Sequence, residues 1–303
     1  MLEPRYEAQV RLLLRCLPVL RGHPEFALKG GTAINLFLQP LPRISVDIDL
    51  AYLPIGPRDE TLAEIGGKLA ALGRELVERL PQVVVQPQLT DGRLVRLVVS
   101  SPEARVKIEP NTIFRGSVFP AEEAELCVEA QRLFQAYVRA QILHVADLYG
   151  GKLCAALDRQ HPRDLFDVKL LLDRAGVTPE IRRAFVVYLA GHNRPMHELL
   201  QPRVKDISSL YRTQFVGMTR REVPLDELVA VQTELPRVLR EALDGDERAF
   251  LLSLKTGNPE WERLGIEHLA QLPALQWKLV NIRRMERVKH LDALRRLEKL
   301  LAH

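Results

Sequence analysis

The chain has 303 residues, of which 47% are hydrophobic and 27% are charged, and its formal net charge is +4. These proportions are typical of a globular protein with one large domain or two of ordinary size, and they exclude a disordered or low-complexity chain. No apolar run approaches the roughly 20 residues that a membrane-spanning helix needs, the N-terminus has no apolar signal-peptide core, and the three cysteines follow no metal-ligand spacing. We therefore expect a cytoplasmic protein.

The first elements predicted are a helix, a short strand and a glycine turn. Apolar residues recur at intervals of three and four over residues 3–20, which predicts an amphipathic helix packed on a sheet. An apolar strand over residues 26–28 then stops at Gly30 and Gly31, where the backbone can turn tightly and approach a ligand closely. Thr32 is expected to cap the short helix that follows, and the free N–H groups at such a helix start suit a phosphate.

A second strand, predicted over residues 46–50, carries two acids. Side chains alternate along a strand, so Asp47 and Asp49 share one face. Neighbouring carboxylates repel each other unless a cation lies between them, and hard oxygen ligands suit Mg²⁺. The loop before this strand holds Arg43 and Ser45. The glycine turn and the paired acids together indicate nucleotidyl transfer.

The next elements are a helix over residues 58–80 and three strands over residues 83–89, 94–99 and 105–109. The third of these strands contains Glu109. A carboxylate on a strand after the paired acids could ligate a metal or accept a proton from an attacking hydroxyl. The alternative is an ordinary acid at the end of a strand, exposed to water.

The composition changes from strands to helices near residue 120. Residues 116–140 are ambiguous, whereas helices are predicted from His144 nearly to the end. We therefore expect an α+β protein with one domain over residues 1–120 and a largely helical domain over 121–303. From Lys278 onward the chain has eight Lys and Arg residues and three acids, which suits a nucleic-acid backbone or, equally, a solvated helix face.

A second group of charged residues lies in this helical part. Lys152 and Arg159 are seven residues apart and share a helix face, and Asp164 and Asp167 share a face of the next helix. A lysine placed by nearby acids is a good phosphate ligand. The alternative is a surface ion pair between Arg163 and Asp167 that contributes a few tenths of a kcal/mol.

The glycine turn followed by the Asp-x-Asp strand resembles the nucleotidyltransferase superfamily related to DNA polymerase beta. The finer pattern KGGTA…R-x-S-x-DIDL is similar to the AbiEii-type nucleotidyltransferase toxins of toxin–antitoxin systems, a group that includes the MenT enzymes. Thr32 stands where the superfamily usually has serine, so a hydroxyl is retained. The resemblance covers nearly the whole chain, and its specific motifs lie in residues 29–50 and 147–167. It implies a polymerase-beta-like core with a small mixed sheet, followed by a largely helical C-terminal domain whose first helices complete the site.

The resemblance also implies roles for individual residues. The catalytic residues would be Asp47, Asp49, Glu109, Lys152 and Asp167. One or two Mg²⁺ ions would be held by Asp47, Asp49 and Glu109. The NTP would be bound by Gly30, Gly31, Thr32, Arg43, Ser45 and Lys152. These groups would be supported by Asp158, Arg159, Arg163 and Asp164.

The function implied is a toxin that transfers a nucleoside monophosphate from an NTP to an RNA acceptor, most simply the 3′ end of tRNA, and so blocks translation. An antitoxin protein would be its partner. Two alternatives stay open: transfer to a protein hydroxyl, and a non-catalytic module that binds a nucleotide or an antitoxin. The intact Asp47/Asp49 pair and Lys152 argue against the non-catalytic module.

Overall fold

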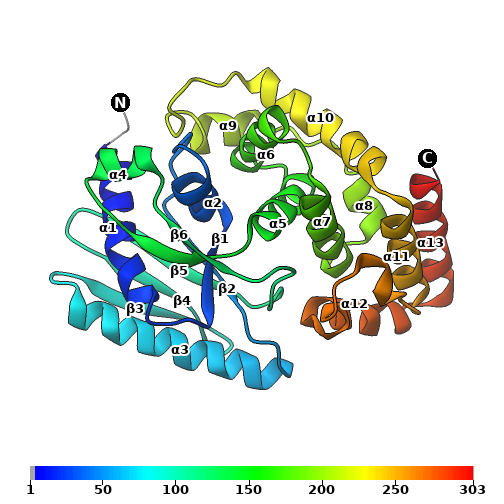
Figure 1. The fold of residues 1–303 in the computed structure, drawn as a ribbon, viewed down its shortest axis with the longest axis horizontal. Coiled ribbons are helices and arrows are strands. Elements are labelled where there is room, and N and C mark those ends of the chain that lie inside the picture. Colours follow the sequence, from blue (N-terminus) through cyan, green and yellow to red (C-terminus); the bar gives the residue numbers. More distant parts are fainter. Residues whose placement is uncertain (1–3, 303) are drawn as a thin grey trace. The chain divides into compact units, whose positions relative to one another are not determined.

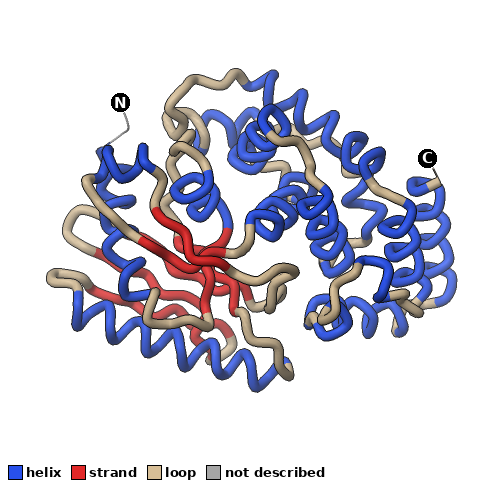
Figure 2. The backbone as a smooth tube through the Cα atoms, viewed as in Figure 1, coloured by secondary structure: helices blue, strands red, loops and turns tan. Residues whose placement is uncertain are grey.

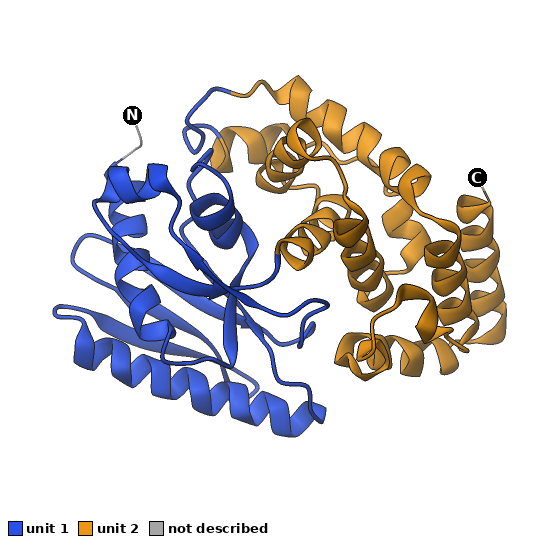
Figure 3. Cartoon of the chain, in the orientation of Figure 1, with its two compact units in different colours: residues 1–144, 216–222 blue, residues 145–215, 223–303 orange. Residues whose placement is uncertain are grey.

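The computed structural model describes residues 4–302, and the chain forms two compact units (Figure 3). Unit 1 takes the chain up to His144 together with Val216–Glu222, and unit 2 takes Val145–Phe215 and the chain from Val223 onward. The boundary expected at residue 120 falls inside unit 1. The division comes later than expected because two strands that follow residue 120 join the sheet.

Unit 1 is built on a seven-stranded mixed sheet with the order β3-β4-β5-β2-β1-β7-β6 (Figures 1 and 2). Its central pairs are β1 with β2, which is antiparallel, and β2 with β5, which is parallel. The strands are β1 (Phe26–Lys29), β2 (Ile48–Tyr52), β3 (Val84–Thr90), β4 (Arg93–Ser100), β5 (Arg105–Asn111), β6 (Glu122–Glu125) and β7 (Arg139–Ile142).

The five strands predicted from the sequence are confirmed to within two residues at each end. Alternation is clear on β5, where Val106 and Ile108 are buried while Lys107 is exposed. On β4, in contrast, the consecutive residues 97–99 are all buried. The two strands that were not predicted are β6 and β7, which pair with each other antiparallel, and β7 also pairs with β1.

The helices of unit 1 agree in part with the prediction. They are α1 (Pro4–Leu20), α2 (Gly30–Ala33), which continues as a π-helical turn (Ile34–Leu38), α3 (Arg58–Arg79) and α4 (Val128–Phe134). The helix expected over residues 58–80 is confirmed as α3. The helix expected over residues 3–20 is α1, and residue 3 lies outside the described part. Helices α1 and α3 contact each other and the sheet, which places their buried leucines against the strands.

The segment Val216–Glu222 lies far along the chain and yet belongs to unit 1. Met218 accepts a hydrogen bond from the Ile44 N–H at 2.8 Å, and the Arg220 N–H donates to the Pro42 carbonyl at 3.0 Å. Arg43 and Thr219 face each other in this antiparallel bridge. The loop that precedes β2 is therefore held by backbone bonds on both sides of Arg43.

Unit 2 is helical. Its helices are α5 (Val145–Asp158), α6 (Pro162–Arg174), α7 (Pro179–Gly191), α8 (Met196–Leu200), α9 (Ser208–Gln214), α10 (Leu225–Ala242), α11 (Gly245–Thr256), α12 (Pro273–Arg283) and α13 (Arg287–Leu301), with two 3₁₀ turns, Trp261–Leu264 and Leu269–Gln271. Proline begins α6, α7 and α12, where its missing N–H is not needed. Among the described residues, no helix is both long and apolar enough to cross a membrane.

Helices α5 and α7 of unit 2 pack extensively against each other, and Gly150 allows this. A Cβ atom at Gly150 would lie 2.8 Å from the backbone nitrogen of Phe185, so any larger residue would push α7 away. On the same pair, the buried Tyr188 hydroxyl donates to Asp147 Oδ1 at 3.0 Å. Burial and the Asp147 charge together raise the pKa of Tyr188 well above its usual value. The tight pairing fixes the backbone from which Lys152 projects.

Candidate active site

The glycine turn lies directly against the second acid of the Asp-x-Asp strand. Lys29 at the end of β1 pairs with Asp49 on β2. Gly30 then turns with a φ of +71°, and a Cβ atom there would lie 2.7 Å from Asp49 Oδ2. Only glycine provides both this backbone angle and this space. The turn and the carboxylate are therefore parts of one surface, as the sequence motif predicted.

The buried side chains of Thr32, Ser45 and Arg43 pack against this turn. Thr32 is 1% exposed, and its hydroxyl lies 2.5 Å from the Asp47 carbonyl oxygen and 2.9 Å from the Ser45 hydroxyl. Arg43 is 2% exposed, donates to the Ile44 carbonyl at 2.9 Å, and fills the space beside Gly31. The structure thus places Thr32, Ser45 and Arg43 where they join the turn to the start of the acidic strand.

The expectation that Thr32 caps the following helix is wrong. The helix begins at Gly30, directly after β1, and the residue before it is Lys29. The Thr32 side chain lies inside the first turn, where Asp47 and Ser45 use its hydroxyl. A tertiary contact has taken the side chain that a local capping bond would need.

Glu109 is the neighbour of Asp49 across the sheet. The two residues are partners in the parallel register of β2 and β5, so their side chains leave the same face. Arg96 on β4 binds Glu109 Oε2 through both Nε and Nη2 at 2.6 Å. Sequence reasoning missed Arg96, because its place opposite Glu109 follows from the pairing register of β4 and β5.

The acids of unit 1 fit a magnesium ion by their chemistry. Asp47 and Asp49 offer hard oxygen donors beside a turn suited to phosphates, and Mg²⁺ is commonly held by one or two carboxylates together with substrate phosphates and water. Over residues 4–302 the structure gathers no three Asp, Glu, His or Cys side chains closely enough to hold a metal ion on their own. Glu109 would therefore join the two aspartates only if its carboxylate turned toward them.

Unit 2 carries a separate, buried charge cluster. Lys152 Nζ lies 2.8 Å from Asp164 Oδ1 and 3.0 Å from Asp167 Oδ2, and all three side chains are at most 5% exposed. Arg159, which is largely exposed, reaches Asp164 with its Nε at 2.5 Å. Burial alone would raise the pKa of the Asp164 carboxyl, but the charges of Lys152 and Arg159 outweigh burial and hold it well below its usual range.

The remaining predicted residues of unit 2 do not all join this cluster. Asp158 was expected to support Lys152, but its carboxylate accepts from Arg194 Nη1 at 2.8 Å. Arg163 lies in the first turn of α6, and its N–H donates to His161 Nδ1 at 3.2 Å, which caps the helix. Of the four predicted supporting residues, Arg159 and Asp164 are thus placed directly around the lysine.

Comparisons with known proteins agree with this description. A family model described as nucleotidyl transferase AbiEii toxin, type IV toxin–antitoxin system, matches residues 11–280. Among solved structures, the chain is similar to MenT4, a nucleotidyltransferase toxin from Mycobacterium tuberculosis H37Rv, with a TM-score of 0.59, 20% sequence identity, and coverage of 97% of this chain and 94% of that chain. No match was found among curated proteins. The predicted α+β fold, a mixed sheet followed by helices, is confirmed.

Proposed function

Because the chain belongs to the AbiEii family of nucleotidyl transferase toxins of type IV toxin–antitoxin systems, we propose that it is a Mg²⁺-dependent enzyme that transfers a nucleoside monophosphate from an NTP to RNA. The acceptor in this proposal is the 3′ end of tRNA. A nucleotide added there blocks aminoacylation and hence translation in the cytoplasm. An antitoxin protein is the partner that this family membership suggests.

The observation that carries the proposal is the contact between the Gly30 turn and Asp49. The turn lies so close to Asp49 that a Cβ atom on Gly30 would be 2.7 Å from its carboxylate oxygen, so a phosphate held at the turn would need a cation between it and the carboxylate. The neighbouring carboxylate of Glu109 lies next in register across the sheet. Phosphate, cation and acid on one sheet face are what transfer of a nucleotide requires.

In this proposal the residues of unit 1 bind the metal, bind the phosphates and accept the proton. Asp47 and Asp49 would hold Mg²⁺, which when bound neutralises charge on the triphosphate. Backbone groups of the Gly30–Gly31 turn hold the phosphates in place. Glu109, kept in position by Arg96, accepts the proton of the attacking hydroxyl. The attack occurs at the α-phosphorus, so that a new phosphate ester forms, the bond to the β-phosphate oxygen breaks and pyrophosphate leaves.

In this proposal Lys152 binds the leaving phosphates and Asp167 orients it. An ammonium group has three N–H donors, and Asp164 and Asp167 take two directions, so a third remains for a phosphate oxygen. The two carboxylates also hold a flexible side chain in one place, which positions its charge. Arg159 supports this arrangement through Asp164.

The proposal is tested by incubating the protein with each α-labelled NTP, Mg²⁺ and total tRNA, and separating the products on a denaturing gel. We expect label on tRNA with one or more NTPs and none when EDTA removes the metal. Transfer RNA that has been oxidised with periodate is the matched control, because it lacks the 3′-terminal hydroxyl pair. It should take up no label.

Two other results would replace the proposal. Label on a protein band and not on RNA would establish transfer to a protein hydroxyl. No transfer from any NTP, with tRNA or with a cell extract as acceptor, would leave a module that binds without catalysis.

The close fit at Gly30 makes a second prediction. Replacing Gly30 by alanine is expected to lower the transfer rate by about a hundredfold, because the new Cβ would displace the Asp49 carboxylate and a shift of about 1 Å in a catalytic group can cost that much. The left-handed backbone angle should also cost about 1–2 kcal/mol of stability.

Gly92 provides the control for this substitution. It lies in the hairpin between β3 and β4 with a φ of +74°, and a Cβ there would meet nothing within 4 Å. Gly92→Ala should therefore show the loss of stability and keep the transfer rate. If Gly30→Ala and Gly92→Ala proved equally active, the contact with Asp49 would have no catalytic importance.

A further inference from the structure

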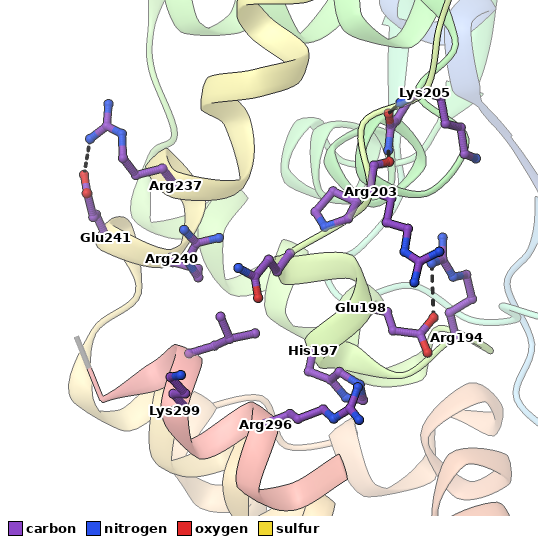
Figure 4. Close-up of a pocket in the computed structure, with 14 residues that line it drawn as sticks. Arg194, His197, Glu198, Arg203, Lys205, Arg237, Arg240, Glu241, Arg296 and Lys299 are labelled. Atoms are coloured by element: carbon purple, nitrogen blue, oxygen red, sulfur yellow. Dashed lines mark hydrogen bonds and ion pairs between the residues drawn. The ribbon is translucent and has the colours of Figure 1, made fainter. Parts of the chain in front are cut away.

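Unit 2 contains a cavity of about 980 Å³ whose walls are strongly basic (Figure 4). It lies among α8, α10, α13 and the segment of residues 201–205. Seven of its fourteen lining residues are Lys or Arg, and two are Glu. The walls are joined firmly, since Arg248 donates to the carbonyls of Leu301 at 2.6 Å and of Arg240 at 2.7 Å, and so ties the end of α13 to α10.

Three of these cations are neutralised within the protein. Arg194 pairs with Asp158 at 2.8 Å and with Glu198 at 3.1 Å, Arg237 pairs with Glu241 at 2.7 Å, and Arg296 pairs with Asp292 at 2.9 Å. Such exposed pairs stabilise a fold by at most about 1 kcal/mol. Their positive charge is largely cancelled before any ligand arrives.

The other four cations lack an acidic partner within residues 4–302. The Lys205 ammonium donates to the Asp158 carbonyl at 2.8 Å, and the Arg240 guanidinium donates to the Leu200 carbonyl. The structure gives no ion pair to the remaining two, which are Arg203 and Lys299. Several uncompensated charges of one sign inside a concave surface repel each other and attract an anion.

The shape of the ligand follows from the rest of the lining. None of the fourteen lining residues is Phe, Tyr or Trp, and His197 is the one aromatic ring among them, so the cavity offers little surface on which bases could stack. Its other uncharged polar side chains are Gln160 and Gln201. Outside the cavity, α13 adds one more exposed cation, Arg295, which lies four residues before Lys299. An extended chain of phosphates fits this distribution better than a compact ligand does.

We propose that this basic cavity binds the phosphate backbone of the RNA acceptor. The naming of RNA rests on the proposed function. The contacts are to phosphate and carry no base sequence, so they position the acceptor without selecting it. The sequence suggested that the basic residues from Lys278 onward contact a nucleic-acid backbone. Lys278 itself does not face a ligand, because it is 9% exposed and donates to the carbonyls of His192 at 2.6 Å and Arg194 at 2.8 Å.

The test removes the two cations that have no partner. Both Arg203 and Lys299 are exposed, so the double substitution Arg203→Gln with Lys299→Gln should leave the fold intact, as a thermal melt would confirm. The control is Arg74→Gln with Arg132→Gln, which removes the same charge from exposed positions of unit 1. Binding of dye-labelled tRNA is measured by fluorescence anisotropy over a series of salt concentrations.

We expect the cavity variant to bind tRNA at least about tenfold more weakly than the control variant. The negative slope of log K against log salt should become shallower by about 1.5, since two phosphate contacts are removed and each contributes roughly 0.7–0.9. In the transfer assay the KM for tRNA should rise while the KM for NTP and kcat stay the same. Equal tRNA affinity and equal salt slopes in the two variants would overturn the proposal.

A further experiment tests whether the ligand of the cavity is RNA or a small polyphosphate. Inorganic triphosphate is titrated by calorimetry into the wild-type protein and the cavity variant. Binding of triphosphate that is lost in the variant, with tRNA affinity unchanged, would make the cavity a site for a small anion and overturn the RNA assignment. Failure of the transfer reaction is visible separately, because tRNA binding by this cavity needs neither NTP nor Mg²⁺.

Discussion

Replacing Asp49 by asparagine is expected to lower nucleotidyl transfer by about a thousandfold or more. Asparagine has nearly the same shape, so the contact with the Gly30 turn should remain, but the side chain loses the charge that would hold Mg²⁺. A metal ion at a transferring phosphate contributes several kcal/mol, and each 1.36 kcal/mol is a factor of ten in rate. The rate is measured with the labelled NTP that gives the strongest signal.

The matched control is Asp59→Asn. Asp59 is an exposed acid in the first turn of α3 and pairs only with surface arginines. Its substitution should change the rate by less than twofold. A fully active Asp49→Asn protein would show that the Asp-x-Asp strand is not the metal-binding element and would remove the basis of the proposed mechanism.

The second large effect concerns stability. Replacing Lys152 by methionine is expected to lower the free energy of unfolding of unit 2 by about 3–5 kcal/mol, because the change takes the ammonium from two buried carboxylates. Both tryptophans, Trp261 and Trp277, belong to unit 2, so their fluorescence during urea unfolding reports on this unit.

Lys169 provides the comparison. It also pairs with two acids, Asp173 at 2.6 Å and Glu227 at 3.4 Å, but its side chain is 24% exposed. Lys169→Met should cost less than about 1 kcal/mol. Adding Asp167→Asn to Lys152→Met should restore part of the loss, since it removes one buried charge. A Lys152→Met protein as stable as Lys169→Met would contradict the view that the buried charges depend on this lysine.

Much of unit 1 could be predicted because most of its strands are runs rich in apolar and β-branched residues between turn residues. The apolar positions of β2 and β5 face the core, and the acids between them share the opposite face. The strands β6 and β7 could not be found in this way. Their sequences, EEAE and RAQI, are short and polar. They pair with each other, and β7 joins the sheet by pairing with β1, which lies far from it in the chain.

The site shows the same division. The glycine turn and the Asp-x-Asp strand follow from local residues, whereas the bond from Arg96 to Glu109 depends on the pairing register of two strands. Asp158 illustrates the opposite error. The family resemblance implied that it supports Lys152, but adjacent residues on a helix point in different directions, and the Asp158 carboxylate binds Arg194.

The return of Val216–Glu222 to unit 1 has a consequence for how the protein is made. On the ribosome, Pro42 and Ile44 emerge long before Met218 and Arg220, their backbone partners. The sheet can form early, but the loop that leads into the Asp-x-Asp strand gains its partner only after α5 to α9 have been synthesised. A nascent or prematurely ended chain therefore carries Asp47 and Asp49 without the backbone bonds from residues 218 and 220 that hold the loop before them. A toxin built in this way is completed only late in its own synthesis.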